Sequence, residues 1–158
     1  GEILAQAADA KMKFEAVVVA TGSGGTQGGL VAGMQLLDGA PVIGIAVEGD
    51  RREQEALAAR QAAESLRLLG RANIDLSGQV NVMDDFVGPG YARPTDTMRE
   101  ALGLAARFEG LVLDPVYTGK AFAGFLSLAR SGRFDKKQSL LFVHTGGTPG
   151  LFGYPEAI

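Results

Sequence analysis

Three observations predict an α/β fold: an open, mostly parallel, twisted sheet with helices on both faces, arranged in three αβα layers. Short apolar runs at 16–20, 42–47 and 140–143 have the composition of strands buried on both faces of a parallel sheet. Amphipathic helical patterns alternate with these runs, which is typical of right-handed strand–helix–strand crossovers. No linker, repeat or low-complexity segment divides the 158 residues, so we expect a single domain over 1–158.

The first half of the chain is expected to alternate helix and strand. A helix over 2–12 precedes the strand at 16–20, and a glycine-rich loop follows that strand. The next helix has apolar positions at helical spacing, namely Leu30, Gly33, Met34 and Leu37. Pro41 comes directly before the next expected strand, at 42–47. A long helix then runs from about Arg52 to Leu69 and is expected to face inward with Ala58, Ala62, Ser65, Leu66 and Leu69.

The second half continues the alternation with shorter apolar segments. A brief segment at 80–83 leads to a Gly-Pro-Gly loop, and Thr95 or Asp96 caps the helix that follows. This helix carries the apolar residues Met98, Ala101, Leu102 and Ala105. The short apolar segment 111–113 ends at an Asp-Pro pair, where a helix cannot continue. A further helix carries Phe122, Phe125, Leu126 and Ala129.

The composition excludes several kinds of partner and site. A net charge of −3 with dispersed basic residues argues against nucleic acid, and no apolar run approaches the roughly 20 residues of a membrane span. With no Cys and one His, we expect no disulfide and no metal site, and the pair Asp84-Asp85 is typical of a loop or cap. No signal peptide is visible, so a cytoplasmic location is expected. The opening at Gly1 in a helical pattern predicts a fragment or a processed chain.

Glycine is concentrated in the loop Gly22–Gly29, between a buried strand and a helix. In open α/β sheets ligands bind beyond the carboxyl ends of the strands, where N–H groups at a helix N-terminus attract anions. Ser23 and Thr26 add hydroxyls. A P-loop would need Ser or Thr after the Gly119-Lys120 pair, and a dinucleotide fingerprint would need Gly in place of Gln27. The loop therefore predicts a site for one compact phosphate, with a merely structural strand–helix turn as the alternative.

Other polar residues cluster where strand ends and loops should converge, and each has a structural interpretation. Tyr91 and Tyr117 would be amphipathic residues at the edge of the core, and Lys120 would be a surface residue on a helix. The remaining interpretations are Thr118 as a helix N-cap, Asp114 as a turn former and His144 as a hydrogen-bonded structural residue.

Taken together, four segments in this order closely resemble the D-cysteine desulfhydrase and 1-aminocyclopropane-1-carboxylate (ACC) deaminase family. The segments are Thr21–Thr26, Gly88–Tyr91, Glu109–Lys120 and His144–Gly147, and the resemblance runs over about 2–154. This family belongs to the fold-type II, tryptophan-synthase-β-like enzymes, which use pyridoxal 5′-phosphate. The resemblance implies that the glycine loop holds the cofactor's phosphate.

The resemblance also implies roles for individual residues. The phosphate cup corresponds to Ser23, Gly24, Gly25 and Thr26. Thr118 and Thr145 match positions near the pyridine ring, and Tyr91 and Tyr117 match active-site tyrosines that contact substrate and take part in proton transfer. The deaminase branch typically has Glu at the position of Thr118 and Leu at that of Thr145, so both positions favour the desulfhydrase branch.

One departure from the family is large. Members are about twice as long, and their Schiff-base lysine lies in an N-terminal portion that this chain lacks. The chain thus resembles the large-domain, C-terminal fragment of a fold-type II enzyme, and we expect it to be inactive alone.

For the full-length parent, expected to be a homodimer, the resemblance implies a lyase of amino-acid metabolism. It would convert a small amino acid, best D-cysteine, to pyruvate, ammonia and hydrogen sulfide by α,β-elimination. The alternatives are ACC deamination and a non-catalytic phosphate-ligand-binding or assembly module.

Overall fold

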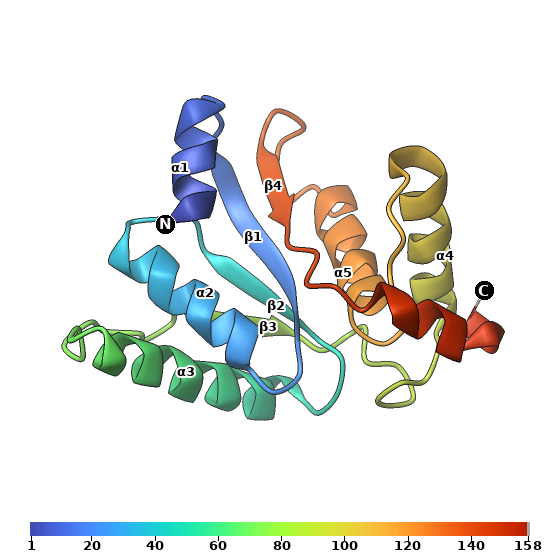
Figure 1. Ribbon diagram of the computed structural model, residues 1–158, viewed down its shortest axis with the longest axis horizontal. Coiled ribbons are helices and arrows are strands. Elements are labelled where there is room, and N and C mark those ends of the chain that lie inside the picture. The colour runs from blue at the N-terminus through green and yellow to red at the C-terminus, as the bar shows by residue number, and fades with distance from the viewer. Residues whose placement is uncertain (158) are drawn as a thin grey trace.

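The computed structural model describes residues 1–157, so Ile158 of the expected domain lies outside the described residues. The chain alternates helices and strands (Figure 1). The elements are α1 (Glu2–Asp9), β1 (Phe14–Thr21), α2 (Gly25–Leu36), β2 (Val42–Ala46), α3 (Arg51–Leu68), β3 (Val80–Met83), α4 (Asp96–Leu104), the π-helical turn η1 (Ala105–Glu109), α5 (Thr118–Arg130), β4 (Ser139–Phe142), and the 3₁₀ turns η2 (Thr148–Gly153) and η3 (Pro155–Ala157).

Among residues 1–157, four strands form one parallel sheet in the order β3-β2-β1-β4. The chain moves outward from β1 to β2 and β3, and then returns to place β4 on the other side of β1. In Figure 1, α1, α2 and α3 lie to one side of the sheet, and α5 and α4 lie to the other. The predicted three-layer architecture is confirmed.

The central strands β1 and β2 are buried on both faces, and successive side chains of a strand point in opposite directions. Val17 and Val19 of β1 pack with α2 and α3, whereas Val18 and Ala20 pack with α5. All of these side chains are buried, as the wholly apolar run predicts. The fully buried strand predicted at 140–143 is not observed, because β4 lies at the edge of the sheet and its residues are only half-buried. The apolar segment 111–113 does not join the sheet and runs as irregular chain.

Helices α2 and α3 approach closely through glycine, and this contact sets which face α2 buries. A Cβ on Gly28 would lie 2.8 Å from the carbonyl oxygen of Ala58, so only glycine fits at this crossing. The buried residues of α2 are Gln27, Gly28, Val31, Ala32 and Met34. Leu37, the last of the four apolar positions of the predicted helix, is the C-cap of α2 and is 46% exposed. On α3, Ala58, Ala62 and Leu66 are buried as predicted, but Leu69 follows the helix end and is exposed.

The cap of α4 is Thr95, one of the predicted alternatives, whose Oγ1 accepts a hydrogen bond from the amide of Met98 at 3.2 Å. The helix buries Met98 and Ala101, and Ala105 follows in η1, so the predicted apolar face is confirmed there. Across residues 1–157, every helix is too short or too polar to traverse a bilayer.

Candidate active site

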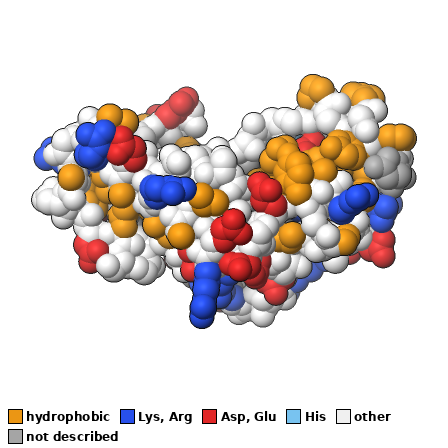
Figure 2. Space-filling view, turned by 90° about the horizontal axis from the view of Figure 1, so that it is seen from below, with side chains coloured by type: hydrophobic (Ala, Val, Ile, Leu, Met, Phe, Trp, Pro, Cys, Tyr) orange, Lys and Arg blue, Asp and Glu red, His pale blue; other side chains and the backbone are white. Residues whose placement is uncertain are grey.

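The parallel strands bring the candidate residues to one edge of the sheet. The glycine loop follows β1, Glu48 follows β2, and the loops that carry Tyr91 and Thr145 come after β3 and β4. Figure 2 views the molecule from the side of this edge and shows acidic side chains gathered near the middle, with apolar ones beside them. This is the edge at which ligands bind in open α/β sheets, and β1 lies where the strand order reverses.

The glycine loop is shaped by a close approach to α3. Gly24 has a φ of +77° and is the N-cap of α2, and a Cβ there would lie 2.8 Å from the amide nitrogen of Ala58. No side chain caps α2, so the amides of its first turn face outward without an intrahelical acceptor. Ser23 and Thr26 flank them and are exposed. The positive end of the helix dipole, the free backbone amides and the two hydroxyls together form a site that can bind an anion.

The space beside the loop fits a phosphate group. A Cβ on Gly25 would meet only the Ser23 Oγ, at 3.8 Å, so a ligand can approach this stretch of backbone closely. At the end of β1, the buried Thr21 Oγ1 has no hydrogen-bond partner within the described chain. Residues 23–26 thus fit the phosphate of the implied cofactor in charge, donors and room.

A buried carboxylate organises the turn before α5. The two Asp114 carboxylate oxygens accept hydrogen bonds from the amides of Val116, Tyr117 and Thr118, each at 2.8 Å. The Thr118 hydroxyl donates to Asp114 Oδ1 at 2.6 Å and accepts from the Asp114 amide at 2.9 Å. Asp114 is therefore more than a turn former, because it fixes the backbone that carries Tyr117. The predicted N-cap role of Thr118 is wrong by one position, since Tyr117 occupies the N-cap and Thr118 begins the helix.

The structure brings the two candidate tyrosines together. The Tyr91 and Tyr117 hydroxyls share a hydrogen bond, and their rings meet edge to face with centroids 5.9 Å apart. Both side chains are partly exposed, as the core-edge interpretation predicts. The hydrogen bond with Tyr117, together with partial burial, raises the pKa of Tyr91 to about 12. The Glu48 and Asp114 carboxylates lie near enough to add to this shift.

Lys120 differs from the prediction that it lies on the surface. Its side chain is 0% exposed, and Nζ donates hydrogen bonds to the carbonyl oxygens of Val87 at 2.7 Å and Gly90 at 2.8 Å. Burial lowers its pKa. Sequence reasoning missed this residue because a lysine in an amphipathic helix ordinarily points to solvent, and no local pattern distinguishes the exception.

The segment after β4 packs against the Asp114 turn. A Cβ on Gly147 would lie 2.7 Å from Asp114 Oδ1, and the Thr148 hydroxyl donates to the Val112 carbonyl at 2.9 Å. His144 Nδ1 accepts from the Gly146 amide at 3.0 Å and Nε2 lies 3.3 Å from the Val112 oxygen, which confirms its structural role. Thr145 is exposed on this segment.

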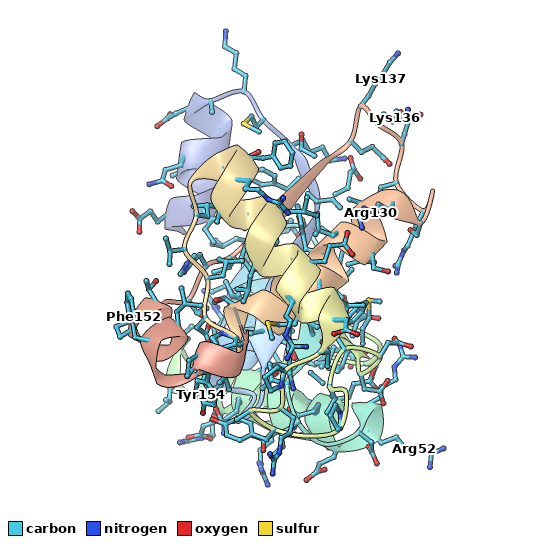
Figure 3. The ribbon with its side chains drawn as sticks, turned by 90° about the vertical axis from the view of Figure 1, so that its right-hand side faces the viewer. Arg52, Arg130, Lys136, Lys137, Phe152 and Tyr154 are labelled. Atoms are coloured by element: carbon cyan, nitrogen blue, oxygen red, sulfur yellow. The ribbon has the colours of Figure 1, made fainter. Side chains whose placement is uncertain are left out.

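The other lysines lie far from this edge. Lys11 and Lys13 precede β1, and Lys136 and Lys137 precede β4, so all four are at the amino edge of the sheet. Figure 3 shows Lys136 and Lys137 extending away from the body, at the opposite end from Phe152 and Tyr154 of the C-terminal turns. None of them is placed to reach a ligand at the glycine loop.

Two acidic residues near the site accept hydrogen bonds from backbone amides at the start of α3. Asp84 accepts a hydrogen bond from the Arg51 amide at 2.9 Å, and Asp50 accepts one from the Glu53 amide, so both cap α3. This confirms the predicted cap role of the Asp84-Asp85 pair through Asp84. Within residues 1–157, no group of three or more His, Asp or Glu side chains is gathered as a metal site would require.

An open parallel sheet with an anion site at its carboxyl edge is typical of enzymes that bind phosphorylated ligands. Comparison with known proteins shows which family of such enzymes this chain belongs to. Residues 1–146 match the family of pyridoxal-phosphate dependent enzymes, and the chain belongs to that family. Its relatives include a D-cysteine desulfhydrase of Klebsiella pneumoniae (strain 342), 42% identical over 155 residues, which cover 96% of this chain and 45% of that protein. The D-cysteine desulfhydrase of Salmonella newport (strain SL254) is 38% identical over 154 residues.

A solved structure agrees with the sequence relatives. The crystal structure of an ACC deaminase homologue matches with a TM-score of 0.83 and 32% identity over 98% of this chain and 46% of that chain. The chain therefore spans about half the length of the relatives that it matches.

Proposed function

We propose that this chain is the portion of a pyridoxal 5′-phosphate-dependent lyase that holds the cofactor's phosphate and presents a tyrosine pair to the substrate. The whole protein would catalyse α,β-elimination of a small amino acid, with D-cysteine as the first candidate, giving pyruvate, ammonia and hydrogen sulfide. One observation carries the proposal: the uncapped α2 N-terminus and the Tyr91–Tyr117 pair lie at the same edge of the sheet. The D-cysteine desulfhydrase relatives support the choice of reaction.

The phosphate would be held by the backbone amides that begin α2 and by the hydroxyls of Ser23 and Thr26. The cofactor, when bound, supplies an electron sink for the bonds broken at the substrate's α-carbon. Gly24 holds the loop against α3, and Gly25 leaves the backbone open to the ligand. These residues orient the cofactor without contributing a charged side chain.

The tyrosine pair would donate hydrogen bonds and relay protons. With its pKa raised to about 12, Tyr91 keeps its proton at neutral pH, so it acts as a donor and not as a base. Its hydrogen bond to Tyr117 links the two phenols, so a proton lost from one can be replaced through the other. Asp114 keeps Tyr117 in place by accepting its amide hydrogen.

Thr118 and Thr145 are the proposed neighbours of the pyridine ring. The Thr118 hydroxyl donates its hydrogen to Asp114 and accepts the hydrogen of the Asp114 amide, so it has no hydrogen left to donate to the ring and only one lone pair to offer it. A neutral oxygen stabilises a protonated ring nitrogen less than a carboxylate would, which suits expulsion of a thiolate from the β-carbon. ACC deamination stays the second candidate because the matching crystal structure is that of an ACC deaminase homologue.

Substrate choice is tested on the full-length protein. Sulfide released from D-cysteine, sulfide from L-cysteine and ammonia from ACC are measured side by side. D-Cysteine should be preferred, and Thr118→Glu combined with Thr145→Leu should shift the preference toward ACC. A full-length protein that binds no pyridoxal phosphate, or that turns over only ACC, contradicts the proposal.

Phosphate binding is tested on the 158-residue chain itself. Pyridoxal phosphate and pyridoxal are titrated separately, and only the phosphorylated form should bind. Gly25→Asp places a carboxylate in the proposed cradle and should weaken binding at least about tenfold, the equivalent of about 1.4 kcal/mol. Gly29→Asp is the matched control, because this position is also on α2, is exposed and has no neighbour within 4 Å of a Cβ. Equal losses in the two variants would refute the assignment, and steady sulfide release by this chain would refute its expected inactivity.

A further inference from the structure

Lys120 occupies a position that is unfavourable for a cation. It lies in the first turn of α5, where the helix dipole is positive, and its side chain is completely buried. Removing an ammonium group from water is costly unless its hydrogens are bonded. The bonds that compensate run to the carbonyl oxygens of Val87 and Gly90, in a different segment of the chain.

Those carbonyls bracket the Gly-Pro-Gly turn that leads into Tyr91. Gly88, Gly90 and Ala92 have φ values of +66°, +145° and +55°, so this loop holds an unusual backbone conformation that includes a strained alanine. The backbone hydrogen bonds at its ends are long, at 3.2 Å from the Val87 amide to Asp84 and from the Arg93 amide to Gly90. Such a conformation persists only where its surroundings hold it.

The start of α5 carries both Tyr117 and the lysine that holds the loop of Tyr91. Tyr117 is the N-cap of α5 and Lys120 is on its first turn, so the position of the lysine is fixed relative to Tyr117. By holding Val87, just before the turn, and Gly90, its last residue, the Lys120 side chain sets the position from which Tyr91 leaves the loop. The Tyr91 hydroxyl then meets that of Tyr117.

We propose that Lys120 is a positioning residue that fixes the 87–92 loop against α5, so that Tyr91 and Tyr117 form one hydrogen-bonded unit. The importance of this unit for catalysis rests on the proposed function. The positioning itself requires neither cofactor nor substrate, so it can be tested on the chain alone.

The test measures whether Tyr91 keeps its contact when Lys120 loses its donors. Lys120→Met keeps much of the apolar length and removes the hydrogen bonds, and Tyr117→Phe shows the signal of Tyr91 with its partner removed. Tyrosines are labelled with ¹³C at Cζ in a Tyr154→Phe background, and their ionisation is followed by NMR near pH 10.5. Burial lowers the pKa of Lys120, but even its neutral amine keeps the two N–H donors that the two carbonyl oxygens need.

Tyr91 of the wild-type chain, with a pKa of about 12, should be about 3% ionised at that pH, whereas a phenol at its usual pKa near 10 is about 75% ionised. Lys120→Met should move Tyr91 most of the way to its ionisation in Tyr117→Phe. Glu48 and Asp114, the other charged groups that act on Tyr91, are unchanged in these variants.

Controls separate positioning from general damage. Lys137→Met removes an exposed lysine from the opposite edge of the sheet and should leave Tyr91 unchanged. Lys120→Arg retains N–H donors and should retain most of the high Tyr91 pKa. A folded Lys120→Met chain whose Tyr91 stays protonated like the wild type overturns the proposal.

A measurement on the wild-type chain applies even if Lys120→Met does not fold. ¹⁵N NMR of the lysine side chains should show one ammonium group whose hydrogens exchange slowly with water, at a position near the Gly90 backbone. Exchange of the Lys120 hydrogens as fast as those of Lys137 overturns the proposal. Failure of pyridoxal phosphate to bind would count against the proposed function and would leave both readouts unaffected.

Discussion

Replacing Gly24 by alanine tests the close contact that shapes the glycine loop. The new Cβ would lie 2.8 Å from backbone atoms of Leu57 and Ala58, which cannot swing away as a side chain would. Overpacking of this kind costs about 1–3 kcal/mol, and a φ of +77° costs a non-glycine residue about 1–2 kcal/mol more. The free energy of unfolding should therefore fall by about 3 kcal/mol.

Urea unfolding of the 158-residue chain, followed by circular dichroism, measures this loss. With a slope of about 2 kcal/mol per molar urea, the midpoint should fall by about 1.5 M. Gly29→Ala is the matched control, since a Cβ there meets nothing within 4 Å and alanine favours a helix by about 0.5–1 kcal/mol, so its midpoint should rise. The reasoning is refuted if Gly24→Ala unfolds at the same urea concentration as the wild type or above it.

Three further predictions concern the tyrosine pair, the Asp114 turn and the α4 cap. The pKa of Tyr91 is raised to about 12 in the folded state, so the protonated phenol, hydrogen-bonded to Tyr117, stabilises the fold. This contribution to the free energy of unfolding is fully present below pH 10 and is lost as the pH rises through 10–12. Unfolding measured across that range should show a steeper fall for wild type than for Tyr117→Phe, and equal slopes would contradict the shared hydrogen bond. Asp114→Asn replaces an acceptor oxygen by an NH₂ group that faces backbone amides, and should cost about 2–3 kcal/mol in urea unfolding; a neutral result would show that the carboxylate does not organise the turn. Thr95→Ala removes the cap of α4 and should cost about 1 kcal/mol, while Thr95→Ser should lose much less, and equal losses would argue against the cap.

The sheet was predictable because its strands are apolar on both faces. The runs around Val18 and Ile43 have no polar residue to place in solvent, and only a sheet covered on both sides buries such strands. The run around Leu141 has the same composition but forms the half-buried edge strand β4, because composition does not tell an edge strand from a central one. The helices were predictable in position but not always in orientation. The buried face of α2 is set by Gly28, which apolar periodicity does not count as a contact residue, and the periodicity therefore does not distinguish the exposed Leu37 from the buried Met34.

The candidate site was predictable in its parts, because each lies in a loop after a strand. Glycine and proline strongly favour turns, so the loops around Gly24 and Gly90 can be predicted from the sequence. The hydrogen bonds that join the loops are not visible there. The links from Lys120 to Gly90 and between the tyrosine hydroxyls span 30 and 26 residues, and their partners are common residue types in ordinary local contexts.

The position of β4 beside β1 determines when the site becomes complete during folding. β1, β2 and β3 follow one another along the chain, but β4 pairs with β1 from the far end, as in the pair Val17 and Leu141. Closing so long a loop is slow, and a chain leaving the ribosome folds from its N-terminal side. The phosphate cradle should therefore form on the nascent chain before the Thr145 side exists. Until β4 docks, β1 is the edge strand on this side of the sheet and its backbone groups are open to pairing with other chains; once the site is complete, the shorter, half-buried β4 takes over that edge.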